Sequence, residues 1–171
     1  MLKIFNELGP FFEDCYREFG VREYARTVKV TPPTASKTLS YLESEELLKR
    51  REERGHILFR ANRESPILKD LSLIYWRIKL RDVICVIDSE LNSSAIVLFG
   101  SLSKLESRQD SDIDIAVFSP SKKNMELEPH EKKLHRRIQL FRFKTIGDVE
   151  KELRKNITKG YLVQGELDGL A

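Results

Sequence analysis

Apolar and polar residues follow a helical period over most of the first 45 residues. Apolar side chains from Asn6 to Phe19 recur three and four positions apart, which predicts a helix that Gly20 ends. A short second helix is predicted over Val21 to Val28, and a third begins at Thr31-Pro32 and runs to about Glu45. We therefore expect three consecutive helices at the start of the chain.

A strand pattern replaces the helical one after residue 46. Two strands are predicted, over Leu47 to Glu52 and over His56 to Ala61. Gly55 lies between them and can supply the positive φ that a tight hairpin turn often requires. An antiparallel hairpin is therefore expected to follow the three helices.

The segment 65–92 is predicted to connect two domains through helical structure. Ser65 suits the cap of a helix and Pro66 its first position. The apolar stripe changes phase near Lys79, so the segment forms either one long helix that turns its buried face or two helices that meet there. Tyr75 and Trp76 are expected in the core, with a dimer surface as the alternative. The two stripes are Ile67, Leu71, Ile74 and Ile78, and then Leu80, Ile84, Ile87 and Leu91.

Residues 93–171 alternate apolar strands with polar segments. A strand from Ala95 to Phe99 leads into a Gly-Ser turn and a short polar helix. A second strand begins at Asp112, a third is expected around Arg137 to Phe143, and Tyr161 to Val163 predicts an edge strand. This order predicts a mixed sheet with flanking helices.

Composition indicates a globular protein with little net charge. The 171 residues are 40% hydrophobic with a formal net charge of +3, which suits one ordinary domain or two small ones. Charged residues interrupt the longest apolar candidate, Ile67 to Leu91, and the first residues lack a signal-peptide core, so no membrane span and a cytoplasmic location are expected. Cys15 and Cys85 are expected to be buried free thiols.

Two aspartates on the second strand are candidates for binding a metal ion. Asp112 and Asp114 are two residues apart, so a strand projects both carboxylates from one face while Ile113 and Ile115 face the buried side. Mg²⁺ prefers such oxygen ligands and completes its octahedron with water and substrate phosphates. A nucleoside triphosphate would supply those phosphates.

The Gly-Ser turn is the candidate site for the triphosphate. Gly100 lets the backbone approach a phosphate without interference from a Cβ. Ser101 offers a hydroxyl at the start of a predicted helix, whose free N–H groups favour an anion. Either motif alone is more often an ordinary turn or a solvated strand, but their order and separation together predict a nucleotidyltransferase site.

These motifs resemble those of a known family. Phe99-Gly100-Ser101 followed by Asp110-Ser111-Asp112-Ile113-Asp114 resembles the nucleotidyltransferase superfamily of DNA polymerase beta and kanamycin nucleotidyltransferase, and most closely its minimal nucleotidyltransferases. The resemblance implies that Gly100 and Ser101 hold the triphosphate. It also implies that Asp112 and Asp114 are catalytic and bind Mg²⁺. In the family a third carboxylate, on a later strand, completes the metal site and helps to deprotonate the acceptor hydroxyl.

The chain departs from the family pattern in two places. After the Gly-Ser pair, members of the family often carry basic residues and a glycine, whereas this chain has Leu102 and Leu105, and only Lys104 keeps a positive charge for the nucleotide. Gln139 stands where the third carboxylate is expected, and the run from Lys132 to Lys144 contains no Asp or Glu. A neutral amide can offer an oxygen to a metal but cannot act as a general base.

Three explanations of Gln139 are open, and they lead to two functions. Catalysis is weak, or another carboxylate such as Glu126, Glu128 or Glu131 takes the role, or the fold serves binding after its chemistry was lost. In the first two cases the protein is an enzyme that transfers a nucleoside monophosphate to a hydroxyl. In the third it is a DNA-binding regulator or antitoxin whose domain binds nucleotide or a partner.

The helices and hairpin before residue 65 resemble the winged helix-turn-helix of archaeal and bacterial transcription regulators, over the segment Thr31 to Arg60. The outer face of the third helix carries short polar groups and one cation, which suits a DNA major groove. The hairpin has an excess of cations that suits phosphate contacts. The alternative is a packing or dimerisation module. The candidates for DNA contact are Thr34, Ser36, Lys37 and Ser40 on the helix, and Lys49, Arg50, Arg51 and Arg54 on the hairpin.

The sequence thus predicts a two-domain protein of the α/β and α+β classes. The expected parts are a winged helix-turn-helix at 1–64, a connecting helix at 65–92 and a nucleotidyltransferase-like domain at 93–171. Mg²⁺ and a nucleoside triphosphate are the expected cofactor and substrate. DNA is an expected partner, and a two-fold dimer suits a winged-helix reader. Minimal nucleotidyltransferases are often antitoxins paired with a small helical protein called HEPN, so the resemblance adds a HEPN-type partner.

Overall fold

The computed structural model describes residues 2–167, which divide into two compact units. Within these residues, unit 1 comprises the chain up to residue 75 together with 105–109. Unit 2 comprises residues 76–104 and the chain from 110 onward. The chain therefore passes between the units three times, and the short segment 105–109 belongs to the unit that precedes it in sequence.

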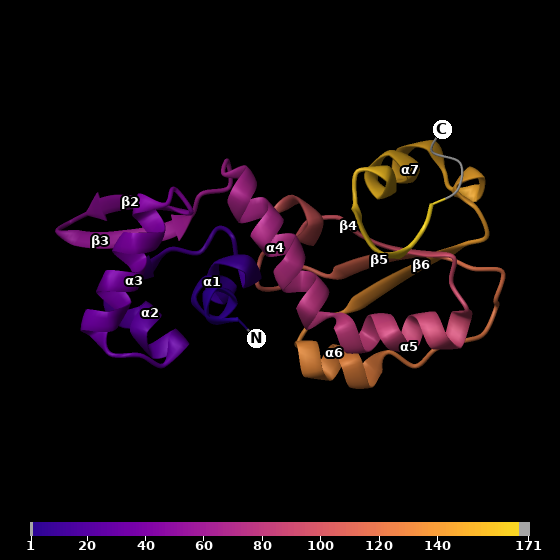
Figure 1. Cartoon of the computed structure of the whole chain (residues 1–171), viewed down its shortest axis with the longest axis horizontal. Helices are drawn as coiled ribbons and strands as arrows, with labels where there is room; N and C mark the ends of the chain where they lie inside the picture. The colour runs from indigo at the N-terminus through magenta and orange to yellow at the C-terminus, as the bar shows by residue number, and fades with distance from the viewer. Residues whose placement is uncertain (1, 168–171) are drawn as a thin grey trace. The chain divides into compact units, whose positions relative to one another are not determined.

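Unit 1 begins with three helices, α1 (Lys3–Glu13), α2 (Val21–Val28) and α3 (Pro32–Ser44), shown in Figure 1. The predictions for the second and third helices are confirmed, and the Thr31 side chain accepts a hydrogen bond from the Thr34 N–H at the start of α3. The first prediction is wrong at its end, because α1 stops at Glu13. The Asp14 carboxylate then accepts hydrogen bonds from the next backbone N–H groups, a local turn that competes with the helix.

A three-stranded antiparallel sheet completes unit 1. Its strands are β1 (Phe19–Gly20), β2 (Leu48–Glu53) and β3 (His56–Ala61), in the order β1-β3-β2. The predicted hairpin is present, and its two turn residues, Arg54 and Gly55, both have positive φ, as a tight hairpin turn of the primed type requires. The prediction placed Phe19 in a helix, whereas the structure uses it as a strand residue paired with Phe59.

The core of unit 1 is aromatic. The ring centroids of Phe11 and Phe19 are 5.1 Å apart in an edge-on arrangement, and the Tyr24 ring packs tilted against Phe11 at 5.8 Å. Cys15 is also buried, as expected, and burial raises the pKa of its thiol. Cys85 lies in unit 2 and is exposed, so the expectation that both thiols are buried is wrong for Cys85.

Two helices follow, α4 (Pro66–Lys79) and α5 (Arg81–Leu91), so the two-helix alternative for this segment is the one observed. The second apolar stripe, from Leu80 to Leu91, is buried as predicted. The first is not, because Ile67 is 63% exposed and Ile74 and Ile78 are also exposed. A neighbouring face of α4 is buried instead, and its aromatic residues Tyr75 and Trp76 offer more apolar area than the isoleucines.

Unit 2 is built on a four-stranded mixed sheet. Its strands are β4 (Ala95–Phe99), β5 (Ile113–Phe118), β6 (Ile138–Phe143) and β7 (Tyr161–Gly165), in the order β6-β5-β4-β7. β5 and β6 are parallel, and the other neighbours are antiparallel. The remaining elements are the 3₁₀ turns η1 (Leu102–Lys104) and η2 (Ile146–Asp148) and the helices α6 (Glu128–Leu134) and α7 (Lys151–Thr158).

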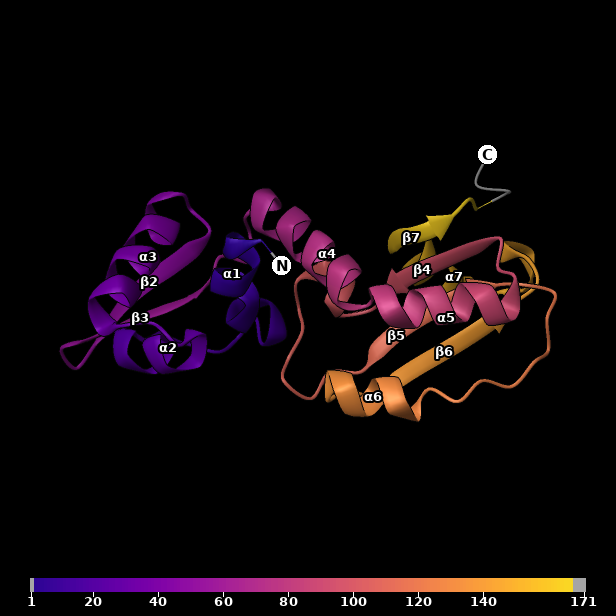
Figure 2. The same ribbon diagram turned by 60° about the horizontal axis from the view of Figure 1, so that its bottom comes forward.

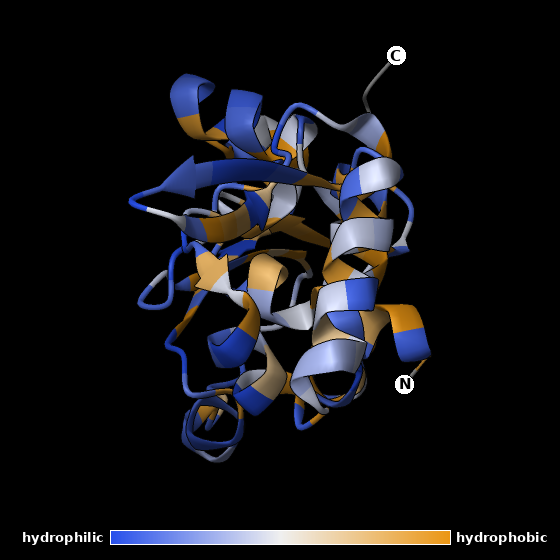
Figure 3. Ribbon diagram, turned by 90° about the vertical axis from the view of Figure 1, so that its left-hand side faces the viewer, coloured by the Kyte–Doolittle hydropathy of each residue, from blue (hydrophilic) through white to orange (hydrophobic). Residues whose placement is uncertain are grey.

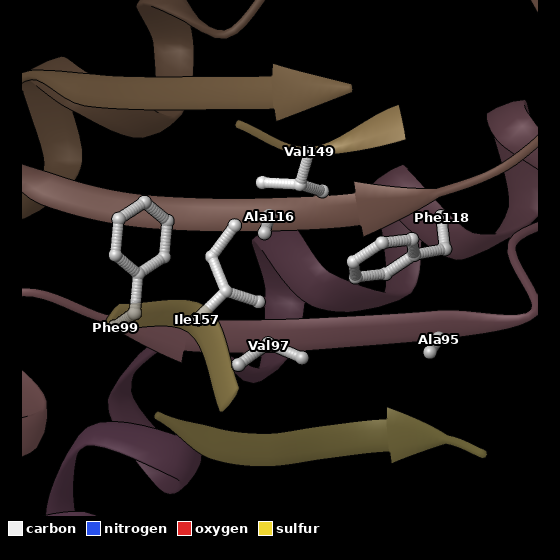
Figure 4. Packing of buried hydrophobic residues seen from close by; sticks show 7 residues of the cluster. All are labelled: Ala95, Val97, Phe99, Ala116, Phe118, Val149 and Ile157. Carbon is white, nitrogen blue, oxygen red and sulfur yellow. The ribbon is translucent and has the colours of Figure 1, made fainter. Parts of the chain in front are cut away.

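Helices lie on both faces of this sheet. In Figures 1 and 2, α5 runs along one face and α7 lies on the other. On the α7 side, alternate residues of β4 and β5 such as Phe99, Ala116 and Phe118 pack with Val149 and Ile157 (Figure 4). The intervening residues, including Ile113 and Ile115, are buried as well. Strands that are covered on both faces form a rigid platform for whatever lies at their ends.

Hydropathy alternates along the helices of both units, which carry hydrophilic and hydrophobic residues in turn (Figure 3). This pattern is typical of helices with one buried face. Over residues 2–167, none of the helices combines the length and the apolar character needed to cross a membrane.

Candidate functional site

The candidate aspartates lie at the N-terminal end of β5, on the sheet face that α7 covers. Asp112 immediately precedes the strand and Asp114 is its second residue. Because side chains alternate along a strand, and because Ile113 and Ile115 are fully buried on the opposite face, the two carboxylates share one side. Asp114 is paired with Phe99 of β4 on one side and with Gln139 of β6 on the other. The geometry predicted for the aspartate pair is therefore the one observed.

Asp114 is half-buried, and its surroundings disfavour its negative charge. Burial raises the pKa of its carboxyl above the ordinary value, and the nearby charge of Asp112 raises it further, while Lys104 acts in the opposite sense. Two carboxylates that repel each other on a rigid strand favour a cation between them. The electrostatics of the pair thus suit a site that binds a positively charged group.

Gly100 is required at its position for two reasons. Its φ is +73°, a conformation that side chains other than glycine adopt only with strain. A Cβ at this position would also collide with the Asp114 carboxylate, lying 3.0 Å from its Cγ. The backbone of the Gly-Ser turn and the carboxylate of Asp114 are therefore in direct proximity, as a shared site requires.

The segment after the Gly-Ser pair differs from the expected short helix. It is a single 3₁₀ turn, closed by a hydrogen bond from the Lys104 N–H to the Ser101 carbonyl at 3.2 Å. The Ser103 hydroxyl donates to the Gly100 carbonyl at 3.0 Å. An α-helix N-terminus is thus not available to Ser101, because the turn is too short to align several peptide dipoles. Leu105 follows with a φ of +57°, the conformation for which a glycine is better suited.

Lys104 lies between the aspartates and helix α7. Its charge lowers the pKa of Asp114, and its ammonium donates a hydrogen bond to the Asn156 side-chain carbonyl at 3.3 Å. Sequence reasoning singled out Lys104 but missed Asn156, which is an exposed polar residue on a charged helix. No local sequence pattern identifies such a residue, because tertiary packing brings α7 close to the 3₁₀ turn that contains Lys104.

Gln139 was singled out in the sequence because a third carboxylate was expected at its position. It lies in register beside Asp114, and its amide nitrogen donates a hydrogen bond to Asp112. The three glutamates considered as substitutes do not complete the site. Within the described part of the chain, no three His, Cys, Asp or Glu residues gather so as to hold a metal ion. Glu131 instead accepts a hydrogen bond from the Ile138 N–H at 2.7 Å, and Glu128 pairs with Lys132.

These residues fit one magnesium ion better than two. Two carboxylates are a sufficient protein ligand set for Mg²⁺, which takes its other ligands from water and phosphates. A second ion needs further negative charge, and Gln139 is neutral. Asp112 and Asp114 would hold the ion.

The DNA-contact candidates belong to unit 1, and some of their side chains are already engaged in contacts within the protein. Two of the cations are engaged within the protein: Lys49 pairs with Glu64, and Arg51 binds Glu18 through two nitrogens and Glu53 at 2.9 Å. Thr34 shares a hydrogen bond with the Thr31 hydroxyl at 2.9 Å. The remaining candidates are exposed, and they are Ser36, Lys37 and Ser40 on α3, Arg50 on β2 and Arg54 in the turn.

Comparison with known proteins bears on unit 2. The family model described as "Polymerase beta, Nucleotidyltransferase" matches residues 82–165. No curated protein and no solved structure matches the chain. The matched range contains the Gly-Ser turn, Lys104, both aspartates and Gln139, and it ends with β7. Residues 82–165 are therefore similar to the nucleotidyltransferases of the polymerase beta family.

Proposed function

We propose that this protein is a Mg²⁺-dependent nucleotidyltransferase of the minimal type, which transfers a nucleoside monophosphate from a triphosphate to a hydroxyl acceptor. The observation that carries this proposal is the seating of Asp114 directly over Gly100, next to Asp112 and within the electrostatic reach of Lys104. A phosphate-binding turn and a metal-binding pair can act on the same nucleotide only if they lie close together. The family match of the same residues supports the proposal.

Each residue has a role that its position supports. Gly100 and Ser101 hold the triphosphate tail, and Lys104 offsets its negative charge. Asp112 and Asp114 would hold Mg²⁺, which would neutralise phosphate charge and help to align the phosphates. The acceptor oxygen forms a bond to the α-phosphorus as the bond to the β-phosphate oxygen breaks. Pyrophosphate leaves, and the hydroxyl proton passes to solvent, since Gln139 cannot accept it.

The experiment that tests this function is incubation with each α-³²P-labelled nucleoside triphosphate and Mg²⁺, with and without a cell extract that supplies acceptors. We expect label to move to an acceptor and the transfer to be lost in the protein that carries both Asp112→Asn and Asp114→Asn. Asp110→Asn is the matched control, because Asp110 is exposed and lies outside the pair. Equal transfer by the double variant would contradict the proposal.

A second candidate is a DNA-binding regulator or antitoxin, whose nucleotidyltransferase domain binds nucleotide with little catalysis. The hydrogen bond of the Gln139 amide to Asp112 favours it, because a neutral group occupies the position of the third carboxylate. Three helices followed by a hairpin support a winged helix-turn-helix interpretation of unit 1. In this function the protein is a homodimer on DNA, with a HEPN-type protein as its partner.

DNA binding is tested by measuring affinity for random-sequence DNA as a function of salt. Arg50→Ala together with Arg54→Ala should weaken binding and reduce its salt dependence, because each lost phosphate contact releases about one counterion fewer. Arg51→Ala is the control, since its guanidinium is held by Glu18 and Glu53. Affinity that is insensitive to salt would exclude this second candidate.

A further inference from the structure

The helix α7 brings a polar side chain to the edge of the nucleotide site. Ile157 of α7 is 1% exposed and packs in the core beneath the sheet face that bears the aspartates, so the helix is anchored there (Figure 4). Its neighbour Asn156 is exposed, and its carbonyl oxygen accepts a hydrogen bond from the Lys104 ammonium. Two segments more than 50 residues apart in sequence therefore meet at this hydrogen bond.

A Lys104 side chain that is already held in place can bind a phosphate at a lower entropic cost than a mobile one. A lysine has four flexible methylene groups, and ordering an unsupported lysine side chain costs up to about 2 kcal/mol of conformational entropy. Only the backbone of Lys104 is held by the 3₁₀ turn. The contact with Asn156 holds the other end of the side chain, in a place from which the ammonium also acts on Asp114.

We propose that Asn156 is a positioning residue of the nucleotide site, which holds the ammonium of Lys104 ready for the negative charge of a triphosphate tail. The inference rests on the function proposed above. A neutral amide suits this role because its hydrogen bond fixes the ammonium without neutralising it. A carboxylate at the same position would form an ion pair with Lys104 and compete with the phosphates.

The role predicts selectivity for the length of the phosphate chain. The hydrogen bond acts through Lys104, so it should matter for a nucleoside triphosphate, whose tail reaches the turn. It should matter little for a nucleoside monophosphate, which lacks the outer phosphates. A merely structural role of Asn156 in α7 would affect both nucleotides equally.

The experiment measures the dissociation constants of the Mg²⁺ complexes of ATP, GTP, CTP and UTP by calorimetry on the full chain, and then of the monophosphate of the tightest one. Asn156→Ala should weaken triphosphate binding about fivefold, as the loss of one hydrogen bond of typical net strength implies, and leave monophosphate binding within about twofold. Asn156→Asp should weaken triphosphate binding further. Lys155→Ala on the same helix is the matched control and should change neither constant, since Lys155 pairs with Glu152 instead.

A double-substitution cycle with Lys104→Ala completes the test. If Asn156 acts through Lys104, Asn156→Ala should have no further effect in the Lys104→Ala background. Additive effects, or equal losses for triphosphate and monophosphate, would overturn the inference while leaving the proposed function intact. Absence of triphosphate binding by the unsubstituted protein would overturn both.

Discussion

At the scale of single residues, the site depends on the space that surrounds the Asp114 carboxylate. Gly100 provides that space, and the nearby charge of Asp112 disfavours the charge of Asp114. The Gln139 amide donates a hydrogen bond to Asp112. Single substitutions at Gly100 and Gln139 should therefore have large and different effects on nucleotide binding and transfer.

Gly100→Ala should abolish nucleotide binding and destabilise the protein. The new methyl group displaces Asp114, and the positive φ adds backbone strain of about 1–2 kcal/mol. Gly55→Ala is the matched control, because Gly55 has nearly the same φ of +76° but no atom within 4 Å of an added Cβ. Urea unfolding and calorimetry of both variants separate the two effects. Similar nucleotide binding by the two variants would show that Asp114 is not displaced.

Gln139→Glu should restore the carboxylate that the family pattern contains. We expect the variant to bind a second divalent ion in the presence of nucleotide and to transfer label about 100-fold faster, the scale of general base catalysis. Gln164→Glu is the control, because the Gln164 amide also donates to an aspartate, Asp88, but lies outside the site. A rate for Gln139→Glu no higher than that of the control would show that the missing carboxylate does not limit the reaction.

A feature of the candidate site was predictable where the residues that produce it lie close together in the sequence. Asp112, Asp114 and Gly100 follow from local spacing, because strand alternation and glycine geometry act within a few residues. The neutral substitution at Gln139 was also visible, as a run without carboxylates. The hydrogen bond between Lys104 and Asn156 was not visible, because it depends on the packing of α7 against the sheet and no pattern within α7 predicts that packing.

At the scale of elements, the errors in the predictions have local causes that compete with periodicity. The first helix was predicted too long because Asp14 ends it with a side-chain turn, a signal that the apolar stripe hides. The prediction placed the stripe of Ile67, Ile74 and Ile78 in the core. Helix α4 has two apolar faces, however, and the helical period does not show which of them is buried. Where one face was clearly apolar, as in α3 and α5, the prediction holds.

The link between β1 and β2 should make the stability of unit 1 depend on pH. Hydrogen bonds from Arg51 hold the pKa of the Glu18 carboxyl below its ordinary value. The contribution of this pair is therefore complete above the ordinary pKa of glutamate and is lost as the pH falls through the lowered value. Urea unfolding from pH 7 to pH 3 should lose less stability in Glu18→Gln than in the unsubstituted protein. An identical pH dependence of both proteins would contradict this account of the hairpin.

At the scale of the whole molecule, a segment between the Gly-Ser turn and the aspartate pair belongs to unit 1. After Lys104, the segment 105–109 packs among residues of that unit. The Ser107 hydroxyl donates to the Phe12 carbonyl at 2.5 Å, and the Cys15 N–H donates to the Ser107 carbonyl at 2.9 Å. The chain therefore leaves unit 2 after Lys104 and returns to it at Asp110, a path that periodicity could not predict.

The reactivity of the two thiols can be used to measure how well segment 105–109 packs within unit 1. Exposed Cys85 should react rapidly with a thiol reagent, whereas Cys15 should react only when unit 1 opens, because it is buried and burial raises its pKa. Ser107→Ala should speed labelling of Cys15 severalfold by removing hydrogen bonds to Phe12 and Cys15. Mass spectrometry of the labelled cysteines distinguishes the sites, with Cys85 as the internal control. Unchanged labelling of Cys15 in Ser107→Ala would show that segment 105–109 does not secure unit 1.

The central claim is that Asp112 and Asp114 bind a divalent ion together with a nucleotide. The most direct test is to count bound Mn²⁺ by electron paramagnetic resonance, with and without a saturating nucleoside triphosphate. We predict one bound ion per protein chain beyond those carried by free nucleotide, and its loss when Asp112→Asn and Asp114→Asn are combined. Full Mn²⁺ binding by the double variant would contradict the assignment of the site.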